Sequence, residues 1–445
     1  GGYLVVNMLD LLIHPFSWET LKKTIENKEL MIEDIGELYG VISTSGMRPE
    51  PIPVNMKVVV IGNPYLYSLL QEYDEDFDKI FKVKADFGMS TRRTDEEVKK
   101  YVQFTAKICR EENLVPFDRS AMAELLGLIS RMVEHKERLS LHFNEVANLI
   151  RESSFWAKED GSETVTAGHV EKAFDEKVYR SNLIEDRIQE VIDEGVLMVD
   201  VDGEKVGQVN GLAVYAVGNY TFGKPTRITS QTYLGRKGVI NLERESELSG
   251  KTHSKGVMIL SNYLGGRYAQ QNPLSLSASL AFEQSYDEVD GDSASAAELI
   301  AILSRLSGTP VRQNLAITGS INQHGEIQPI GGVNEKIEGF FKTCRNRGLT
   351  GTQGVIIPYQ NLKHLCLNKE VVESVEKKQF HIYQVRHIDE AIELITGMDA
   401  GVQLEDGTYP PDTVNARIQQ ALSEMHSRME ENSEDEEEHE EEENV

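Results

Sequence analysis

The 445-residue sequence lacks several features that would place a protein quickly in a class. No run approaches the roughly 18 apolar residues of a membrane-spanning helix, so no membrane span is expected. Residues 1–12 are too short and lack the basic start of a signal peptide. The three cysteines, Cys109, Cys344 and Cys366, show neither metal-ligand spacing nor a disulfide framework. They indicate reduced thiols in a cytoplasmic protein.

Positive charge is also scarce, since the formal net charge is −27. An acidic chain without a basic stripe argues against nucleic-acid binding. Residues 430–445 contain eleven acidic residues and no Lys or Arg. Like charges repel there and nothing apolar is available to bury, so a disordered acidic tail is expected.

The phosphate-binding pattern Gly-x-x-x-x-Gly-Lys-Ser/Thr is absent as well. Without that loop, phosphates have no backbone N–H cradle and Mg²⁺ lacks its hydroxyl ligand. This chain alone is therefore not expected to hydrolyse ATP, and no cofactor or metal is expected. Because the sequence does not begin with Met, we expect it to be a fragment. ATP–Mg²⁺ would then enter only through a loop upstream of Gly1.

The pattern of apolar residues in the first part of the chain changes at about residue 93, from strand-like runs to helical spacing. Residues 3–6 and 57–62 are apolar runs typical of buried strands, which predicts an α/β region over residues 1–93. Residues 94–184 instead carry apolar side chains at helical spacing throughout. A helical subdomain is therefore expected to follow the α/β region.

The most informative serine is Ser293, where the sequence turns from polar residues to a helical pattern beginning at Ala294. Such a serine has two interpretations. It can be an N-cap, whose hydroxyl accepts a backbone N–H. It can also be a nucleophile, with free N–H groups nearby to hold an oxyanion.

A lysine is the second candidate. Gly331-Gly332 opens a helix that carries Lys336 beside Ile337 and Phe340. Desolvation and the positive end of the helix dipole both favour the neutral amine, which can act as a general base. A Ser–Lys dyad is a known variant of nucleophile and base, whereas most lysines on helices are solvated surface residues.

Three motifs in order resemble the proteolytic domain of Lon proteases, and the B-type and C-type branches most closely. They are Gly291-Asp292-Ser293-Ala294-Ser295, Thr318-Gly319 and the run from Pro329 to Lys336. The resemblance covers roughly residues 185–400. It implies that Ser293 is the nucleophile, that Lys336 is the base and that Thr318 orients the lysine. Asp292 is expected to hydrogen-bond Lys336 or to hold a resting conformation, and the backbone N–H groups of Ser293 and Ala294 to bind the oxyanion.

The first part of the chain resembles AAA+ ATPases. Residues 1–12 stand in the place of the Walker B strand, but Asn7 and Met8, or a shifted Asp10, replace its acids. Residues 58–64 resemble the sensor-1 strand, with Asn63 as the sensor.

Residues 94–184 resemble the small helical subdomain of those ATPases. Within and just before it, Arg92-Arg93 resembles an arginine finger, and Arg131 or Arg138 a second sensor. With no nucleotide site in the chain, the simpler interpretation is that these arginines form salt bridges.

Together these observations predict a multidomain fold of α/β, all-α and α+β parts. The expected domains are a partial AAA+ α/β subdomain (1–93), a helical AAA+ small subdomain (94–184), a Lon-type protease domain (185–400) and a C-terminal extension (401–445). In the protease domain, strands are expected near 206–217, 225–231, 257–261, 276–283, 314–321 and 354–358, and helices near 254–270, 294–307 and 334–347.

The expected function is that of an ATP-independent Lon-like serine endopeptidase. Its resemblance to Lon implies unfolded protein or peptide substrates and a homo-hexameric chamber. One alternative is the protease fragment of an ATP-dependent Lon whose phosphate-binding loop lies outside this chain. Another is a peptidase-silent, chaperone-like ring, against which the intact Ser293, Thr318 and Lys336 argue.

Overall fold

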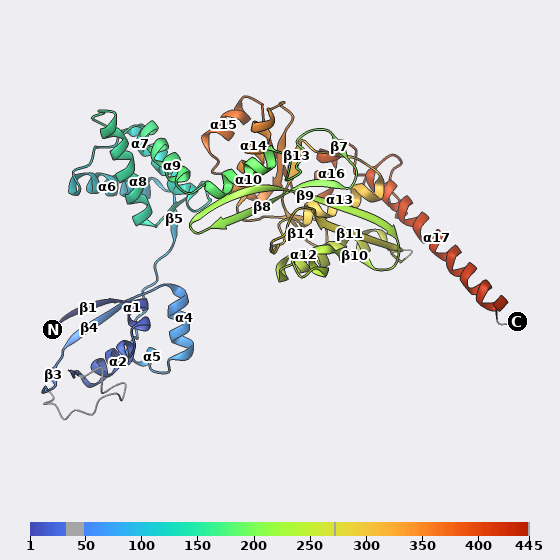
Figure 1. The fold of residues 1–445 in the computed structure, drawn as a ribbon. Coiled ribbons are helices and arrows are strands. Elements are labelled where there is room, and N and C mark those ends of the chain that lie inside the picture. Colours follow the sequence, from blue (N-terminus) through green and yellow to red (C-terminus); the bar gives the residue numbers. More distant parts are fainter. Residues whose placement is uncertain (33–48, 271–272, 444–445) are drawn as a thin grey trace. The chain divides into compact units, whose positions relative to one another are not determined.

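The computed structural model describes residues 1–32, 49–270 and 273–443 (Figure 1). The chain divides into two compact units, residues 1–88 and 89–445. The second unit begins slightly before the expected boundary at residue 93, because β5 (Ser90–Arg92) pairs with β6 (Arg138–Ser140) of the helical region.

The first unit contains a two-stranded parallel sheet of β1 (Gly2–Asn7) and β4 (Met56–Ile61). Its helices are α1 (Met8–Ile13), α2 (Ser17–Asn27), α4 (Pro64–Tyr73) and α5 (Phe77–Ile80), and β2 (Glu29–Leu30) pairs with β3 (Ile52–Pro53). The expectation of fully buried strands is wrong here, since Val5 is 58% exposed and Val59 44%. In the described residues, helices pack on one face only, so alternate side chains of these strands face outward.

The first part of the second unit is mostly helical, with the short β5–β6 pair beside its helices. These helices are α6 (Asp95–Glu111), α7 (Arg119–Arg131), α8 (Phe143–Glu159) and α9 (Ala167–Tyr179). These helices enclose an apolar core that includes Leu125, Ile129 and Ile150. We refer to residues 89–182 as the helical subdomain.

The rest of the second unit is built on a seven-stranded mixed sheet in the order β10-β11-β9-β8-β13-β16-β17. These strands are β8 (Gln208–Val217), β9 (Tyr220–Leu234), β10 (Gly238–Asn241), β11 (Leu276–Phe282), β13 (Leu315–Ile317), β16 (Gly354–Pro358) and β17 (His381–Val385). Two short pairs lie beside the sheet, β7 (Glu204–Lys205) with β12 (Val311–Arg312), and β14 (Ser320–Ile321) with β15 (Ile327–Gln328).

Helices cover both faces of this sheet (Figure 1). One layer contains α12 (Lys251–Tyr268), α13 (Ser295–Ser307), α16 (Ile388–Thr396) and α17 (Val414–Glu443), and the other α10 (Leu183–Asp193), α14 (Val333–Arg347) and α15 (Lys369–Glu376). The short helices α11 (Leu242–Glu245) and η1 (Tyr359–His364) complete the set. Strand β13 shows the alternation, because Leu315 and Ile317 pack in the first layer and Ala316 in the second.

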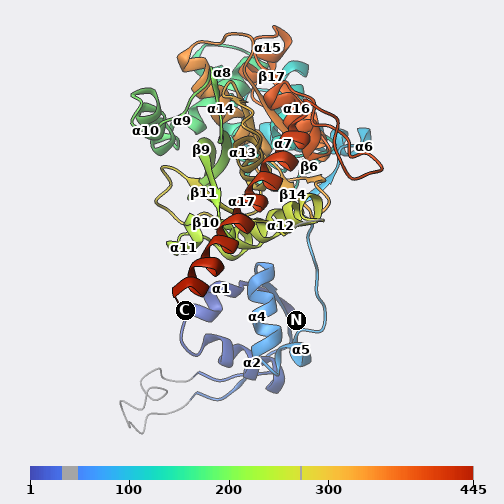
Figure 2. The same ribbon diagram turned by 90° about the vertical axis from the view of Figure 1, so that its right-hand side faces the viewer.

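Two expectations about this region are corrected. Both a strand at 257–261 and a helix near 254–270 were expected, and the helix is confirmed, because Val257, Leu260 and Leu264 of α12 bury one face at helical spacing. The acidic run continues α17 as helix to Glu443, where disorder was expected. That helix already packs along α13 through Val414 and Ile418 (Figure 2), and glutamate is a good helix former once a helix has begun. Residues 444 and 445 of the predicted tail lie outside the described residues.

Across residues 1–32, 49–270 and 273–443, none of the helices combines the length and the apolarity needed to cross a membrane.

Candidate active site

Ser293 lies on the turn that leads into α13. The preceding Gly291 has a φ of +92°, a backbone conformation that suits glycine and permits the sharp turn. Ala294, not Ser293, is the N-cap of α13, and it makes no side-chain cap. The half-buried hydroxyl of Ser293 is therefore not used as a helix cap, and it accepts a hydrogen bond from Lys336 Nζ at 2.8 Å.

Lys336 comes from the opposite helical layer. Gly332, with a φ of +65°, is the N-cap of α14 and places Lys336 in the first turns of that helix. The lysine is only 3% exposed. Burial lowers its pKa from the ordinary 10.5 to about 8, because a charged ammonium is poorly solvated there.

Thr318 joins the two layers. It follows β13 directly, and its N–H donates to Ile356 O of β16 at 3.1 Å. Its hydroxyl accepts from Lys336 Nζ at 3.2 Å and donates to Ser293 O at 3.2 Å. The N–H of Gly319 also donates to Ser293 O, at 2.8 Å. The end of the central strand thus holds the serine turn and the lysine together.

Of the two roles expected for Asp292, the structure does not show the hydrogen bond to Lys336. Its carboxylate accepts a hydrogen bond from the Ser320 hydroxyl at 2.8 Å, and no hydrogen bond joins it to Lys336 in the described part of the chain. Its negative charge nevertheless raises the pKa of Lys336, against the larger effect of burial. Sequence reasoning missed Ser320, although it stands two residues after Thr318, as the alternation of a strand would require.

The first N–H groups of α13 are partly occupied. Ser295 N–H donates to Asp292 O at 3.1 Å, and Ala296 N–H donates to Gly319 O at 3.1 Å. No hydrogen bond from the N–H of Ser293 or Ala294 is found among the described residues. Those two groups are thus available beside the Ser293 hydroxyl, where an oxyanion would form.

Glu298 lies one turn into α13. Its carboxylate pairs with His253 Nε2 of α12 at 2.8 Å, and both side chains are fully buried. Asp290 accepts from the N–H groups of Thr252 and His253, at 3.1 and 3.3 Å. Helix α12 therefore anchors both the serine turn and the serine helix. The sequence offered no signal for His253.

Comparisons with known proteins agree with this architecture. Residues 287–397 match the model of the Lon protease (S16) C-terminal proteolytic domain. A Lon protease homolog of Escherichia coli (strain K12) is 32% identical over 432 residues, which cover 95% of this chain and 71% of the relative. The chain belongs to the Lon protease family. The matched region is thus a serine peptidase domain.

Other relatives and models point to the same branch of the Lon family. A Lon protease homolog of Haemophilus influenzae is 32% identical over 95% of this chain and 69% of its own length. The archaeal Lon protease of Archaeoglobus fulgidus is 28% identical, covering 81% of this chain and 54% of its own. Residues 1–88 match a LonB-like AAA domain, and residues 116–180 match the archaeal LonB AAA+ ATPase LID domain.

The residues of this Lon chain that stand at the AAA+ Walker B and sensor positions make other contacts. The side chain of Asn7 caps α1, and that of Asn63 caps α4 by accepting from Leu66 N–H at 2.8 Å. Arg131 pairs with Glu338 of α14 at 2.6 Å, and Arg138 donates to the Ser90 hydroxyl at 2.9 Å. The Arg131 contact is a salt bridge, as the simpler interpretation expected, whereas Arg138 and Arg93 hydrogen-bond serine hydroxyls.

No cluster of three metal-binding side chains occurs within the part of the chain that the structure describes.

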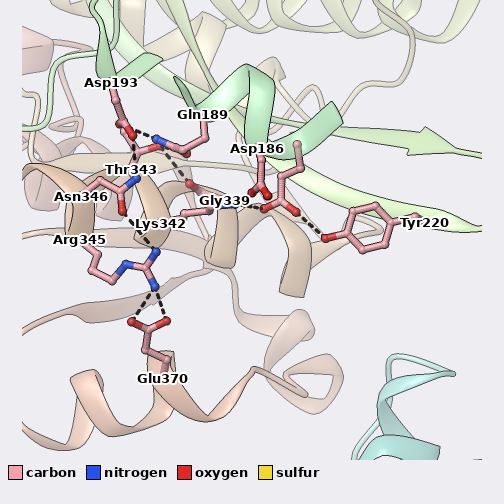
Figure 3. Close-up of polar contacts among 11 residues, drawn as sticks. Asp186, Gln189, Asp193, Tyr220, Gly339, Lys342, Thr343, Arg345, Asn346 and Glu370 are labelled. Carbon is pink, nitrogen blue, oxygen red and sulfur yellow. Dashed lines mark hydrogen bonds and ion pairs between the residues drawn. The ribbon is translucent and has the colours of Figure 1, made fainter. Parts of the chain in front are cut away.

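The outer side of the Lon lysine helix is held by polar contacts (Figure 3). Lys342 pairs with Glu185 and Asp186 of α10 at 3.0 and 2.9 Å. Further along α14, Arg345 pairs with Glu370 of α15 at 2.6 Å, and Asn346 donates to Asp193 at 2.8 Å. These contacts attach α14, the helix that carries Lys336, to the two neighbouring helices α10 and α15.

Proposed function

We propose that this chain is a Ser–Lys endopeptidase. The observation that carries the proposal is the 2.8 Å hydrogen bond from Lys336 Nζ to Ser293 Oγ, made by a buried lysine whose pKa is about 8. A neutral Lys336 takes the proton of Ser293 as its oxygen attacks the peptide carbonyl. The same amine returns that proton to the leaving amine. Water then hydrolyses the acyl-enzyme with Lys336 again as base.

Two further groups complete the proposed mechanism. The N–H groups of Ser293 and Ala294 stabilise the negative oxygen of the tetrahedral intermediate. The Thr318 hydroxyl accepts from the lysine ammonium or amine and keeps Nζ directed at Ser293. Asp292 holds the turn through Ser320 and has no step of its own in the reaction.

We further infer that peptide hydrolysis by this chain does not require ATP. The proposed catalytic groups all lie between Asp292 and Lys336, and the sequence contains no phosphate-binding loop. Unfolded proteins or peptides as substrates, and a homo-hexameric chamber around the sites, follow from the resemblance to Lon proteases.

A second candidate function is the protease part of an ATP-driven Lon. It is favoured by the match of residues 1–88 to a LonB-like AAA domain. In that case ATP–Mg²⁺ would accelerate the degradation of folded proteins in a longer chain that carries the phosphate-binding loop. The peptidase site would be the same.

The test is cleavage of unfolded casein and of a stably folded protein, each with and without ATP–Mg²⁺. The wild type is compared with Ser293→Ala and with Ser246→Ala, which removes an exposed hydroxyl at the C-cap of α11 that donates to Leu242 O. We expect casein cleavage that ATP does not change, that Ser293→Ala abolishes and that Ser246→Ala preserves. Casein left intact by the wild-type assembly would refute the peptidase and favour the chaperone-like ring.

A further inference from the structure

The helical subdomain contacts the lysine helix α14 at its N-cap residue. Glu134, in the turn that follows α7, accepts a hydrogen bond from the N–H of Gly332 at 3.3 Å. Gly332 is the N-cap of α14, one turn before Lys336. Glu134 has a φ of +47°, a left-handed conformation that costs energy for a residue with a Cβ. The surrounding contacts therefore hold this glutamate in place.

Those contacts are made by residues just before and just after Glu134 in the sequence. Arg131, three residues earlier, makes two parallel hydrogen bonds to the Glu338 carboxylate at 2.6 and 2.7 Å, and a third to Cys366 O at 2.7 Å. On the other side of Glu134, Lys136 N–H donates to Lys363 O at 3.0 Å. Bidentate arginine–carboxylate pairs have fixed geometry, so the turn is docked on the protease domain in a defined orientation.

The docked turn brings negative charge near the base. Two carboxylates, Asp292 on the serine turn and Glu134 on the helical subdomain, raise the pKa of Lys336 against the larger effect of burial. The titratable and charged groups that the described residues place around Glu134 and Lys336 are the acids Asp292, Glu335 and Glu338, the cations Arg93, Arg131, Lys136 and Lys363, and His135, His364 and Cys366. Asp292 and Glu338 belong to the protease domain, where Asp292 is hydrogen-bonded to Ser320 and Glu338 is paired with Arg131. Glu134 is the carboxylate that the helical subdomain places at the start of α14.

We propose that Glu134 is a positioning residue of the peptidase, through which the helical subdomain acts on Lys336. The inference rests on the proposed Ser–Lys function. Docked, Glu134 fixes the start of the lysine helix and favours the ammonium form of Lys336. Displacement of the helical subdomain removes both effects, so the subdomain's placement and the peptidase activity are coupled through this one side chain.

The charge and the hydrogen bond of Glu134 can be separated by two substitutions. Glu134→Gln keeps an oxygen that accepts from Gly332 N–H but removes the charge, so more Lys336 is neutral at a given pH. Glu134→Ala removes both, so the start of α14 loses its acceptor as well. Glu137→Gln is the matched control, since it removes an exposed carboxylate of the same turn.

The experiment measures kcat and KM for a fluorogenic peptide between about pH 6 and pH 10 in the full chain. For Glu134→Gln we expect the acid limb to move to lower pH, with kcat/KM about two- to fivefold above wild type near pH 7 and equal to it near pH 10. For Glu134→Ala we expect the same shift with a kcat plateau lowered about three- to tenfold. Glu137→Gln should reproduce the wild-type profile.

Coincident profiles of wild type and folded Glu134→Gln, checked by thermal unfolding, would overturn the inference while leaving the peptidase intact. Failure of the proposed function would look different, because the wild type and Ser293→Ala would then hydrolyse the peptide equally. A shift of the acid limb as large in Glu137→Gln as in Glu134→Gln would also overturn the inference, since it would show a general effect of net charge.

Discussion

Gly223 of β9 and Gly339 of α14 lie backbone against backbone. A Cβ added to Gly339 would collide with the carbonyl oxygen of Gly223, and a Cβ on Gly223 would collide with the carbonyl oxygen of Glu335, next to Lys336. Only two glycines allow a strand and a helix to approach so closely. This close contact packs the lysine helix tightly against the sheet and so contributes to the burial of Lys336.

Gly339→Ala is expected to push α14 away from β9, because the new methyl meets backbone that cannot rotate aside. We expect a loss of about 1–3 kcal/mol in the free energy of unfolding and at least a tenfold fall in kcat. Urea unfolding and peptide hydrolysis measure the two effects.

The control for this substitution is Gly127→Ala in α7, where an added Cβ meets nothing within 4 Å. Alanine is the better helix former, so that variant should be more stable by about 0.5–1 kcal/mol with unchanged activity. An active, stable Gly339→Ala would show that the close approach does not position Lys336.

The pH dependence of hydrolysis should follow the base. Because burial lowers the pKa of Lys336 to about 8, its amine is mostly protonated at lower pH and cannot accept the serine proton. We expect kcat/KM to fall about tenfold per pH unit below about pH 8 and to level off above it. A fall in kcat/KM with its midpoint near pH 6.5 would point to a histidine base instead.

Lys336→Met should abolish activity and stabilise the fold. Folding lowers the pKa of Lys336 from 10.5 to about 8, so the unfolded chain binds the proton more tightly. At pH 7 the folded state carries a poorly solvated ammonium, which costs about 3 kcal/mol. Methionine removes this cost, and we expect a gain of about 2–3 kcal/mol at pH 7 in urea unfolding.

The stability difference between Lys336→Met and the wild type should depend on pH. Between about pH 8 and 10.5 the unfolded wild type binds more protons than the folded wild type, so wild-type stability rises with pH. The advantage of Lys336→Met should therefore shrink across this range. The exposed Lys99→Met is the control and should change stability by less than about 0.5 kcal/mol. A destabilised Lys336→Met at pH 7 would contradict the poor solvation of the ammonium.

Thr318→Val tests the orienting hydroxyl. The substitution keeps the shape of the side chain but removes the oxygen that accepts from Lys336 and donates to Ser293 O. We expect kcat to fall about 10- to 100-fold with KM nearly unchanged. Thr318→Ser keeps the oxygen and should retain most of the activity. Equal losses in both variants would show that the hydroxyl alone does not orient the lysine and that the methyl group is needed as well.

Arg131→Gln tests how firmly the helical subdomain is docked. It would leave the largely buried Glu338 without its cation, at a cost of about 2–4 kcal/mol in urea unfolding. Lys369→Gln breaks an exposed pair with Glu171 between the same two regions and should cost less than about 0.5 kcal/mol. Equal effects of the two substitutions would show that Arg131 is no special anchor.

Much of the site could be predicted because its signals are local. The helix beginning after Ser293 and the paired glycines before Lys336 are read from neighbouring residues, and the structure has α13 and α14 within one residue of the expected helices. Strand 354–358 was also found from its apolar run. Residues 257–261 were misread as strand because a short apolar run has the same composition in either element.

Contacts between distant residues could not be predicted in the same way. Glu134 reaches Gly332 from 198 positions away in the sequence, and His253 meets Glu298 across 45. Neither pair has a local pattern that selects it. Asp292 was expected to hydrogen-bond Lys336 or to hold a resting conformation, and its carboxylate instead accepts from the Ser320 hydroxyl at 2.8 Å, a contact with no local sequence signal.

The sequence by itself determined which groups are available for chemistry: a serine at a helix start, a threonine after a strand and a lysine near the start of a second helix. Only the tertiary structure decided how these groups are placed and which pKa the lysine has. Helices from opposite faces of one sheet bring Ser293 and Lys336 together, and the close approach of Gly223 to α14 helps to exclude water from the amine. Desolvation depends on every residue packed around a group, so the lowered pKa of Lys336 is a property of the fold.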